Sequence, residues 1–151
     1  MKLKVVFLFC LFVLTGCFRV FAQDIQGSSD HPLFSRIPGF SINDYMVEEP
    51  GIYSFHADQD SIITVEGKKT TIHYMCNCVE SPLRIIRSFS NSVRPNGGRS
   101  IEYSDNRIYI NLKKNGREYW AEVYAGQDDY FLTIIELNPV IENNSGTLKQ
   151  Q

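Results

Sequence analysis

The sequence of residues 99–137 is RSIEYSDNRIYINLKKNGREYWAEVYAGQDDYFLTIIEL. Within it, residues 107–113, 117–125 and 129–137 show the two-residue period and the β-branched and aromatic side chains that are typical of strands. Asn115 and Gly116 separate the first two runs and favour a two-residue hairpin, because both turn positions need a positive φ. With the segment that begins at residue 99 as a further strand, the stretch predicts a meander of four antiparallel strands.

One helix is predicted over residues 82–94, just before this meander. Ser81 is expected to cap its first N–H groups, and Pro82 suits the first helical position, where a missing donor costs nothing. Its apolar side chains recur at three- and four-residue spacing and form one stripe, made of Leu83, Ile85, Ile86, Phe89 and Val93. Because that stripe must be buried, we expect an α+β fold, in which a mainly antiparallel sheet carries one principal helix packed on one face.

Four further strands are expected upstream of the helix. Residues 45–48 and 51–56 are short candidates, whereas residues 61–65 and 69–76 have the stronger pattern. Residues 66–68 are Glu-Gly-Lys and predict a turn, so the last two strands should form a hairpin.

The first part of the domain is expected to be irregular. Residues 23–30 are polar and predict a flexible lead-in or tether. Residues 30–40 contain Pro32 and Pro38 but also large apolar side chains, so we expect a strap that closes part of the core without regular secondary structure. The tail, residues 138–151, is expected to be loosely ordered.

Composition limits the possible partners. A chain of 151 residues with 43% hydrophobic residues suggests one domain, which we place at residues 23–137. The net charge is −2, and residues 1–22 contain basic but no acidic side chains, so the remaining domain is more acidic than the whole chain. Such a domain is a poor match for nucleic acid or for electrostatic docking on anionic lipid.

Residues 1–22 are predicted to be an export signal. A basic start is followed by an apolar run at residues 5–16, too short for a membrane span of about 20 residues and typical of a secretory signal. Two processing routes remain open: cleavage after Ala22, or acylation of Cys17 as in a bacterial lipoprotein. Either route predicts the periplasm or outer membrane, with membrane attachment only through a lipid on Cys17.

Five stretches and their order along the chain carry a family resemblance. They are DHPLFSRIPG at residues 30–39, VEGKKTTIHY at 65–74, SPLRIIR at 81–87, YWAEV at 119–123 and YFLTIIE at 130–136. Together they resemble the exported N-terminal module of bacterial OmpA-family envelope proteins. In that family the module precedes a C-terminal domain that binds peptidoglycan, for which this sequence offers no matching segment after the last stretch. The resemblance implies an envelope location and an α+β fold, but no particular reaction.

Cys76 and Cys78 are the most distinctive local motif of the sequence. On a regular strand they would lie on one face about 6.6–7 Å apart, at the edge of disulfide reach, so a bridge needs a bend after the strand. A disulfide suits an oxidising compartment. Free thiols without a function, and redox or soft-metal chemistry, are the alternatives. Zinc would need two further ligands, and no nearby histidine pair supplies them.

Asp30, His31 and Arg36 lie in the predicted strap and are candidates for a ligand-facing loop. The ordinary alternative is that the strap only packs on the core. Glu122 and Glu136 lie on predicted strands and would be paired carboxylates if they converged, although such residues more often lie on solvated faces.

Arg87 and Asn91 lie one turn apart on the predicted helix, where they could bind a carboxylate or a sugar or simply face solvent. Trp120 belongs to an aromatic-rich strand that could stack on a sugar or peptide, or could form core. No catalytic triad motif or phosphate loop occurs, so we assign no catalytic residue, cofactor or metal.

The sequence thus predicts a non-enzymatic binding or scaffold module that recognises an envelope protein, lipid or glycan. The alternative is a small envelope enzyme, either a hydrolase with a pocket near His31 and Arg36 or a thiol redox enzyme at Cys76 and Cys78. A metal carrier at the same two cysteines is a third hypothesis.

Overall fold

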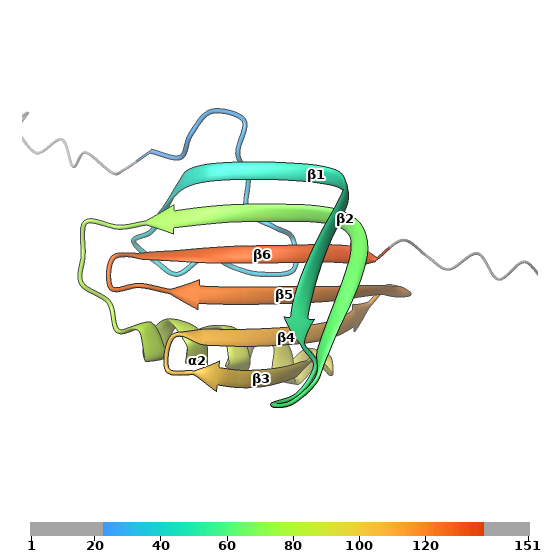
Figure 1. Ribbon diagram of the computed structural model, residues 1–151. Coiled ribbons are helices and arrows are strands. Elements are labelled where there is room, and N and C mark those ends of the chain that lie inside the picture. Colours follow the sequence, from blue (N-terminus) through green and yellow to red (C-terminus); the bar gives the residue numbers. More distant parts are fainter. Residues whose placement is uncertain (1–22, 138–151) are drawn as a thin grey trace, which may run out of the picture.

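The computed structural model describes residues 23–137, and the predicted signal with Cys17 and the predicted tail lie outside this range. The described chain forms one six-stranded antiparallel sheet and one α-helix (Figure 1). This confirms the prediction of a mainly antiparallel sheet with one principal helix, but the sheet has fewer strands than expected. The strand order is β1-β2-β6-β5-β4-β3. The elements are β1 Ser41–His56, β2 Ile62–Met75, α2 Pro82–Val93, the 3-10 turn η1 Arg94–Asn96, β3 Arg99–Ser104, β4 Arg107–Lys114, β5 Arg117–Ala125 and β6 Asp129–Leu137.

The meander of β3 to β6 is confirmed. Asn115 and Gly116 adopt φ values of 53° and 76° and close the β4–β5 hairpin at the predicted position. Ile110 pairs with Ala121, and Ala121 pairs with Ile134, so one row of small and branched side chains crosses three strands. This register places the apolar sets of β4, β5 and β6 on the same face.

The predicted hairpin with its turn at residues 66–68 is wrong, because β2 runs through this segment as a single strand. Gly67 is buried and pairs with Leu137 of β6. A Cβ at this position would collide with the carbonyl oxygen of Glu136, so the glycine permits close strand contact rather than a turn. The chain reverses instead at residues 57–61, where the Ala57 N–H donates to the Ser61 carbonyl at 2.9 Å.

The two short strands expected at residues 45–48 and 51–56 also form one strand, β1. Its register against β2 shifts between Glu48 and Gly51, across a cis Glu49–Pro50 peptide bond. Beyond this point β1 and β2 curve together across one face of the sheet in front of β4 (Figure 1). The curved ends bury a small second core against that face, made of Phe55, Val65, Tyr109, Trp120 and Ile135.

The main core lies on the opposite face of the sheet. Helix α2 covers it with Ile85, Ile86, Phe89 and Val93, as its apolar stripe predicts. The irregular strap at residues 30–40 closes the rest of this core. Phe34 packs on Phe89 with ring centroids 5.8 Å apart, and Phe40 packs on Tyr130 at 5.0 Å.

The predicted flexible lead-in is held to the domain. Asp24 accepts hydrogen bonds from both terminal nitrogens of Arg36 at 2.7 Å, and from the Ile42 N–H at 2.8 Å. The Ile25 N–H also donates to the Ile42 carbonyl at 3.1 Å. The Arg36 guanidinium lowers the pKa of Asp24, so its charge is favoured in the folded state. Polar composition favours a tether, but the partly exposed Asp24–Arg36 ion pair and the backbone hydrogen bond of Ile25 give this segment a defined position.

Candidate functional site

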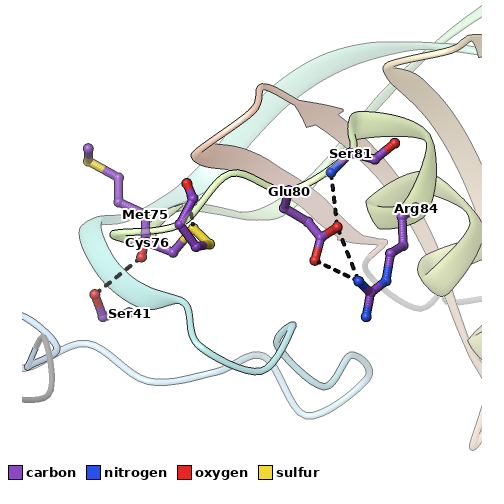
Figure 2. The surroundings of a disulfide bond; sticks show 7 residues. Ser41, Met75, Cys76, Glu80, Ser81 and Arg84 are labelled. Carbon is purple, nitrogen blue, oxygen red and sulfur yellow. Dashed lines mark hydrogen bonds and ion pairs between the residues drawn. A yellow bond between two sulfur atoms is a disulfide. The ribbon is translucent and has the colours of Figure 1, made fainter.

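A disulfide joins Cys76 and Cys78 at the end of β2 (Figure 2). The strand ends at Met75, and the following bend brings the two Cα atoms to 5.2 Å, within the usual range of about 4.4–6.8 Å. Cys76 belongs to the main core and is 7% exposed, whereas Cys78 is exposed. The bridge therefore connects a core residue to a surface residue.

Backbone hydrogen bonds hold the segment at residues 76–80 independently of the bridge. The Cys76 N–H donates to the Asp128 carbonyl at 2.8 Å, and the Glu80 N–H donates to the Gln127 carbonyl at 2.6 Å. Both acceptors lie in the turn between β5 and β6. Both ends of the segment are therefore tied to the same neighbouring turn.

Glu80 rather than Ser81 provides the side-chain contacts at the start of α2. Ser81 occupies the N-cap position, but its side chain makes no capping hydrogen bond, so that prediction is wrong. The Glu80 carboxylate accepts from the Ser81 N–H at 2.9 Å and ion-pairs with Arg84 at 3.3 Å (Figure 2). A carboxylate at this end also suits the positive end of the helix dipole.

A pocket of about 150 Å³ lies between the strap and the sheet. Its lining consists of Ser29, Asp30, His31, Pro32, Tyr45, Lys68, Thr70 and Glu136. We call it the strap pocket. These residues come from the strap, β1, β2 and β6, so only the folded chain brings them together. An open hollow of about 400 Å³ adjoins it and is lined by residues 30–36.

His31 is the half-buried imidazole of the strap pocket. Burial lowers its pKa, Lys68 lowers it further, and Glu136 opposes both. The ring is therefore held neutral near pH 7. Its Nδ1 accepts from the Leu33 N–H at 3.4 Å, which places the ring proton on Nε2. The ring also stands edge-on to Tyr119, with centroids 6.3 Å apart.

Arg36 and Asp30, two of the predicted binding residues, are engaged with other parts of the protein. The Arg36 Nε lies 2.9 Å from both Asp30 oxygens, and its terminal nitrogens bind Asp24. The Tyr74 hydroxyl donates to Asp30 Oδ1 at 2.9 Å. The carboxylates of Asp24 and Asp30 raise the pKa of Arg36, so the guanidinium stays positively charged. Arg36 thus fastens the strap, which argues against the prediction that it binds a ligand, while Asp30 also lines the strap pocket.

The other predicted binding residues lie elsewhere. Arg87 and Asn91 are exposed on α2, which packs on β3, β4 and β5, and neither lines the strap pocket. Trp120 is 9% exposed and packs on Phe55 in the second core, with its Nε1 donating to Glu118 at 3.1 Å. Of the two interpretations that the sequence allowed for Trp120, this burial agrees with a core residue and leaves little of the side chain for stacking on a sugar or peptide.

The register separates the two glutamates that might have formed a carboxylate pair. Glu136 pairs with Lys68 across β2 and β6 and lines the strap pocket. Glu122 lies on the other face of the sheet, where it is buried and accepts from the Tyr53 hydroxyl at 3.1 Å. Burial and the adjacent Glu122 raise the pKa of Tyr53 to about 12, so this phenol stays protonated. The two carboxylates therefore do not converge.

Sequence reasoning missed Lys68, Tyr45, Thr70 and Glu136 as members of one site. Lys68 and Glu136 are ordinary strand charges in the sequence, and their pairing depends on the β2–β6 register. Within residues 23–137, no group of three or more His, Cys, Asp or Glu side chains is arranged to hold a metal ion. The same part of the chain contains no helix of the length and hydropathy needed to cross a membrane.

The sequence matches no model of a known protein family, and no curated protein is significantly similar to it.

Proposed function

We propose that this chain is an exported binding module of the bacterial envelope, and that the strap pocket holds a small charged or polar end of its ligand without catalysing a reaction on it. The resemblance to the OmpA-family module and the signal-like N-terminus support the location. The Cys76–Cys78 disulfide also supports it, because disulfides persist in oxidising compartments. We also class the fold as α+β, since the helix and the sheet occupy separate layers (Figure 1).

The observation that carries the binding proposal is the juxtaposition of opposite charges in the strap pocket. Lys68 and Glu136 are opposite each other on the neighbouring strands β2 and β6, and Asp30 and His31 line the same pocket. Lys68 makes no ion pair with any residue of the 23–137 range, whereas Glu136 pairs with the exposed Arg117. A ligand with both an anionic and a cationic or hydroxyl group would satisfy Lys68 and the carboxylates together.

The size of the strap pocket limits what part of a ligand enters it. A volume of about 150 Å³ is smaller than the roughly 300–1,000 Å³ of sites that enclose a whole drug-sized molecule. The terminal residue of a peptide or one sugar unit of a glycan is therefore the appropriate size, with the adjoining hollow beside the strap receiving the next unit.

The contacts of His31 favour binding over hydrolysis. Because Nδ1 accepts from the Leu33 N–H, the ring proton lies on Nε2, so the nitrogen that is left is a hydrogen-bond donor and not a general base for a nucleophile. A metal carrier at the cysteines is also disfavoured in the oxidised protein, because a disulfide offers no thiolate to a soft metal.

The test is retention of envelope material on the immobilised full chain. Solubilised envelope proteins and cell-wall glycopeptide fragments are passed over wild type, over Lys68→Ala and over the control Arg87→Ala, which alters an exposed helix charge outside the pocket. We expect one specific species to bind wild type and Arg87→Ala, with about tenfold weaker binding to Lys68→Ala, because a charge-assisted hydrogen bond is lost.

Recovery of no specific species on wild type would contradict the proposed function. Equal retention by Lys68→Ala would show that binding, if present, does not use the strap pocket.

A further inference from the structure

The Cys76–Cys78 bridge links no two elements of the fold. Both cysteines belong to one short segment after β2, and the loop that the bridge closes is almost the smallest possible. In the chain-entropy account, a disulfide stabilises a protein by restricting the unfolded chain, and short loops contribute least. The segment is also held at both ends by backbone hydrogen bonds to Asp128 and Gln127. The bridge thus adds little that the fold requires.

The two sides of the bridge differ in accessibility. Cys76 is buried in the main core, whereas Cys78 is exposed and is followed by Val79, which is 87% exposed. Because an incoming thiolate must approach one sulfur along the S–S axis, access favours attack at Cys78. The departing sulfur is then that of Cys76, whose backbone stays fixed by its bond to Asp128.

From this geometry we propose that Cys76–Cys78 is a thiol–disulfide exchange site that oxidises an exposed dithiol of a peptide or protein, with Cys78 as the attacked residue. This site is separate from the strap pocket and does not depend on the function proposed for it.

The exchange takes place in two balanced steps. A thiolate of the partner forms a bond to the Cys78 sulfur, the S–S bond breaks, and the Cys76 sulfur leaves with the electron pair and takes up a proton. The second thiol of the partner, after losing its proton, then attacks the partner sulfur of the mixed disulfide. Cys78 leaves as a thiolate and is protonated. The partner dithiol has become a disulfide, and the bridge has accepted two electrons and two protons.

The reduced pair remains ready for oxidation. Backbone hydrogen bonds still fix the positions of residues 76 and 80, and the Cα atoms of the two cysteines lie 5.2 Å apart in the oxidised form. Exchange with the disulfide of another molecule can therefore reoxidise the two cysteines without a large rearrangement of the fold.

The experiment uses the full chain with Cys10→Ser and Cys17→Ser, so that only Cys76 and Cys78 can react. The oxidised protein is mixed with a reduced synthetic peptide that carries two cysteines, and both partners are alkylated after acid quenching and weighed by mass spectrometry. We expect stoichiometric oxidation of the peptide, and a reduction rate in the folded protein within about tenfold of that in urea, because native exposure of Cys78 makes unfolding unnecessary.

Two single variants compare the accessibility of the two sulfurs, on which the choice of attacked sulfur depends. With oxidised glutathione as the probe, Cys76→Ser should form a mixed disulfide at Cys78 about tenfold faster than Cys78→Ser forms one at buried Cys76.

Circular dichroism of the reduced protein should match that of the oxidised protein. The proposal is wrong if the peptide stays reduced, if exchange proceeds only at the rate of global unfolding, or if Cys76 reacts first. Loss of the folded signal on reduction would instead identify a structural bridge and would also overturn it.

Discussion

At the scale of single residues, His31 and Asp24 both have lowered pKa values, but for different reasons. Burial is the largest cause for His31, and the Arg36 guanidinium is the largest cause for Asp24. For His31, the unfolded chain binds a proton near its ordinary pKa of 6.5 before the folded chain does, so stability falls as the pH falls below that value. For Asp24, the stabilising charge is lost only as the pH falls below its ordinary pKa of 3.8.

Because the two pH ranges are separate, the lowered pKa of the half-buried His31 can be tested by itself. We expect the urea midpoint of wild type to decrease from about pH 7.5 to about pH 5.5, since protonation favours the unfolded chain. His31→Gln removes this titration and should show a smaller decrease over the same range. His56→Gln is the matched control. It retains His31 and should therefore retain the part of the decrease in urea midpoint that His31 causes. An unchanged slope in His31→Gln would show that the His31 pKa is not lowered in the folded protein.

Arg36 shows that the partners of a residue in the strap depend on the tertiary structure. An arginine beside a histidine and an aspartate in a proline-rich loop suggested a ligand site. In the structure its three donor nitrogens are used by Asp24 and Asp30, which both precede it in the chain, one in the lead-in and one at the start of the strap. Composition could not predict this pairing, because the lead-in has no periodic pattern that assigns it a position.

At the scale of elements, the interpretation of Gly67 determines whether residues 62–75 are expected to form one strand or two. A glycine between two charged residues usually indicates a turn, but here it lies where the β6 backbone approaches β2. Local sequence contains no information on that neighbour, which lies about 70 residues later in the chain. The helix, in contrast, is indicated by its own stripe and by Pro82, and it was predicted nearly to its ends.

Substitution of Gly67 distinguishes close packing from turn formation. We expect Gly67→Ala to lower the free energy of unfolding by about 1–3 kcal/mol, because the added methyl group displaces the Glu136 carbonyl and weakens the β2–β6 ladder. Urea unfolding monitored by circular dichroism measures this loss. Glu66→Ala, the exposed neighbour on the same strand, should change stability by less than about 0.5 kcal/mol. Equal effects of the two substitutions would refute the close-packing explanation.

At the scale of the whole molecule, the sheet carries a core on each face. Helix α2 and the strap cover the main core, and the curved ends of β1 and β2 cover the second one. The curved ends, residues 52–56 of β1 and 62–66 of β2, pair with each other. Their position over β4 therefore depends on Phe55 and Val65, which pack against Tyr109 and Trp120. Trp120 is therefore a structural residue of this smaller core.

Removal of the Trp120 side chain should release the curved ends before the rest of the fold. We expect Trp120→Ala to cost about 3–5 kcal/mol of global stability, the usual cost of a large-to-small change in a core. Native-state hydrogen exchange should show greater loss of protection at residues 51–56 and 62–66 than in α2, because those ends pack on the sheet through the second core, whereas α2 packs on the main core.

Tyr124→Ala, an exposed aromatic on the same strand, is the control and should cost less than about 1 kcal/mol. Uniform loss of protection across the domain would contradict a separate second core.

The sequence by itself determined the elements whose signals are local. The two-residue period predicted the strands of the meander, Asn115 and Gly116 predicted its hairpin, and the apolar stripe predicted the helix and the face that it buries. Only the tertiary structure decided that β1 and β2 are each continuous, that Trp120 is core and that Lys68 meets Glu136 beside His31. The physical reason is that periodicity and turn propensity depend on neighbouring residues, whereas register, close strand contact and pocket formation depend on residues that are distant in the chain.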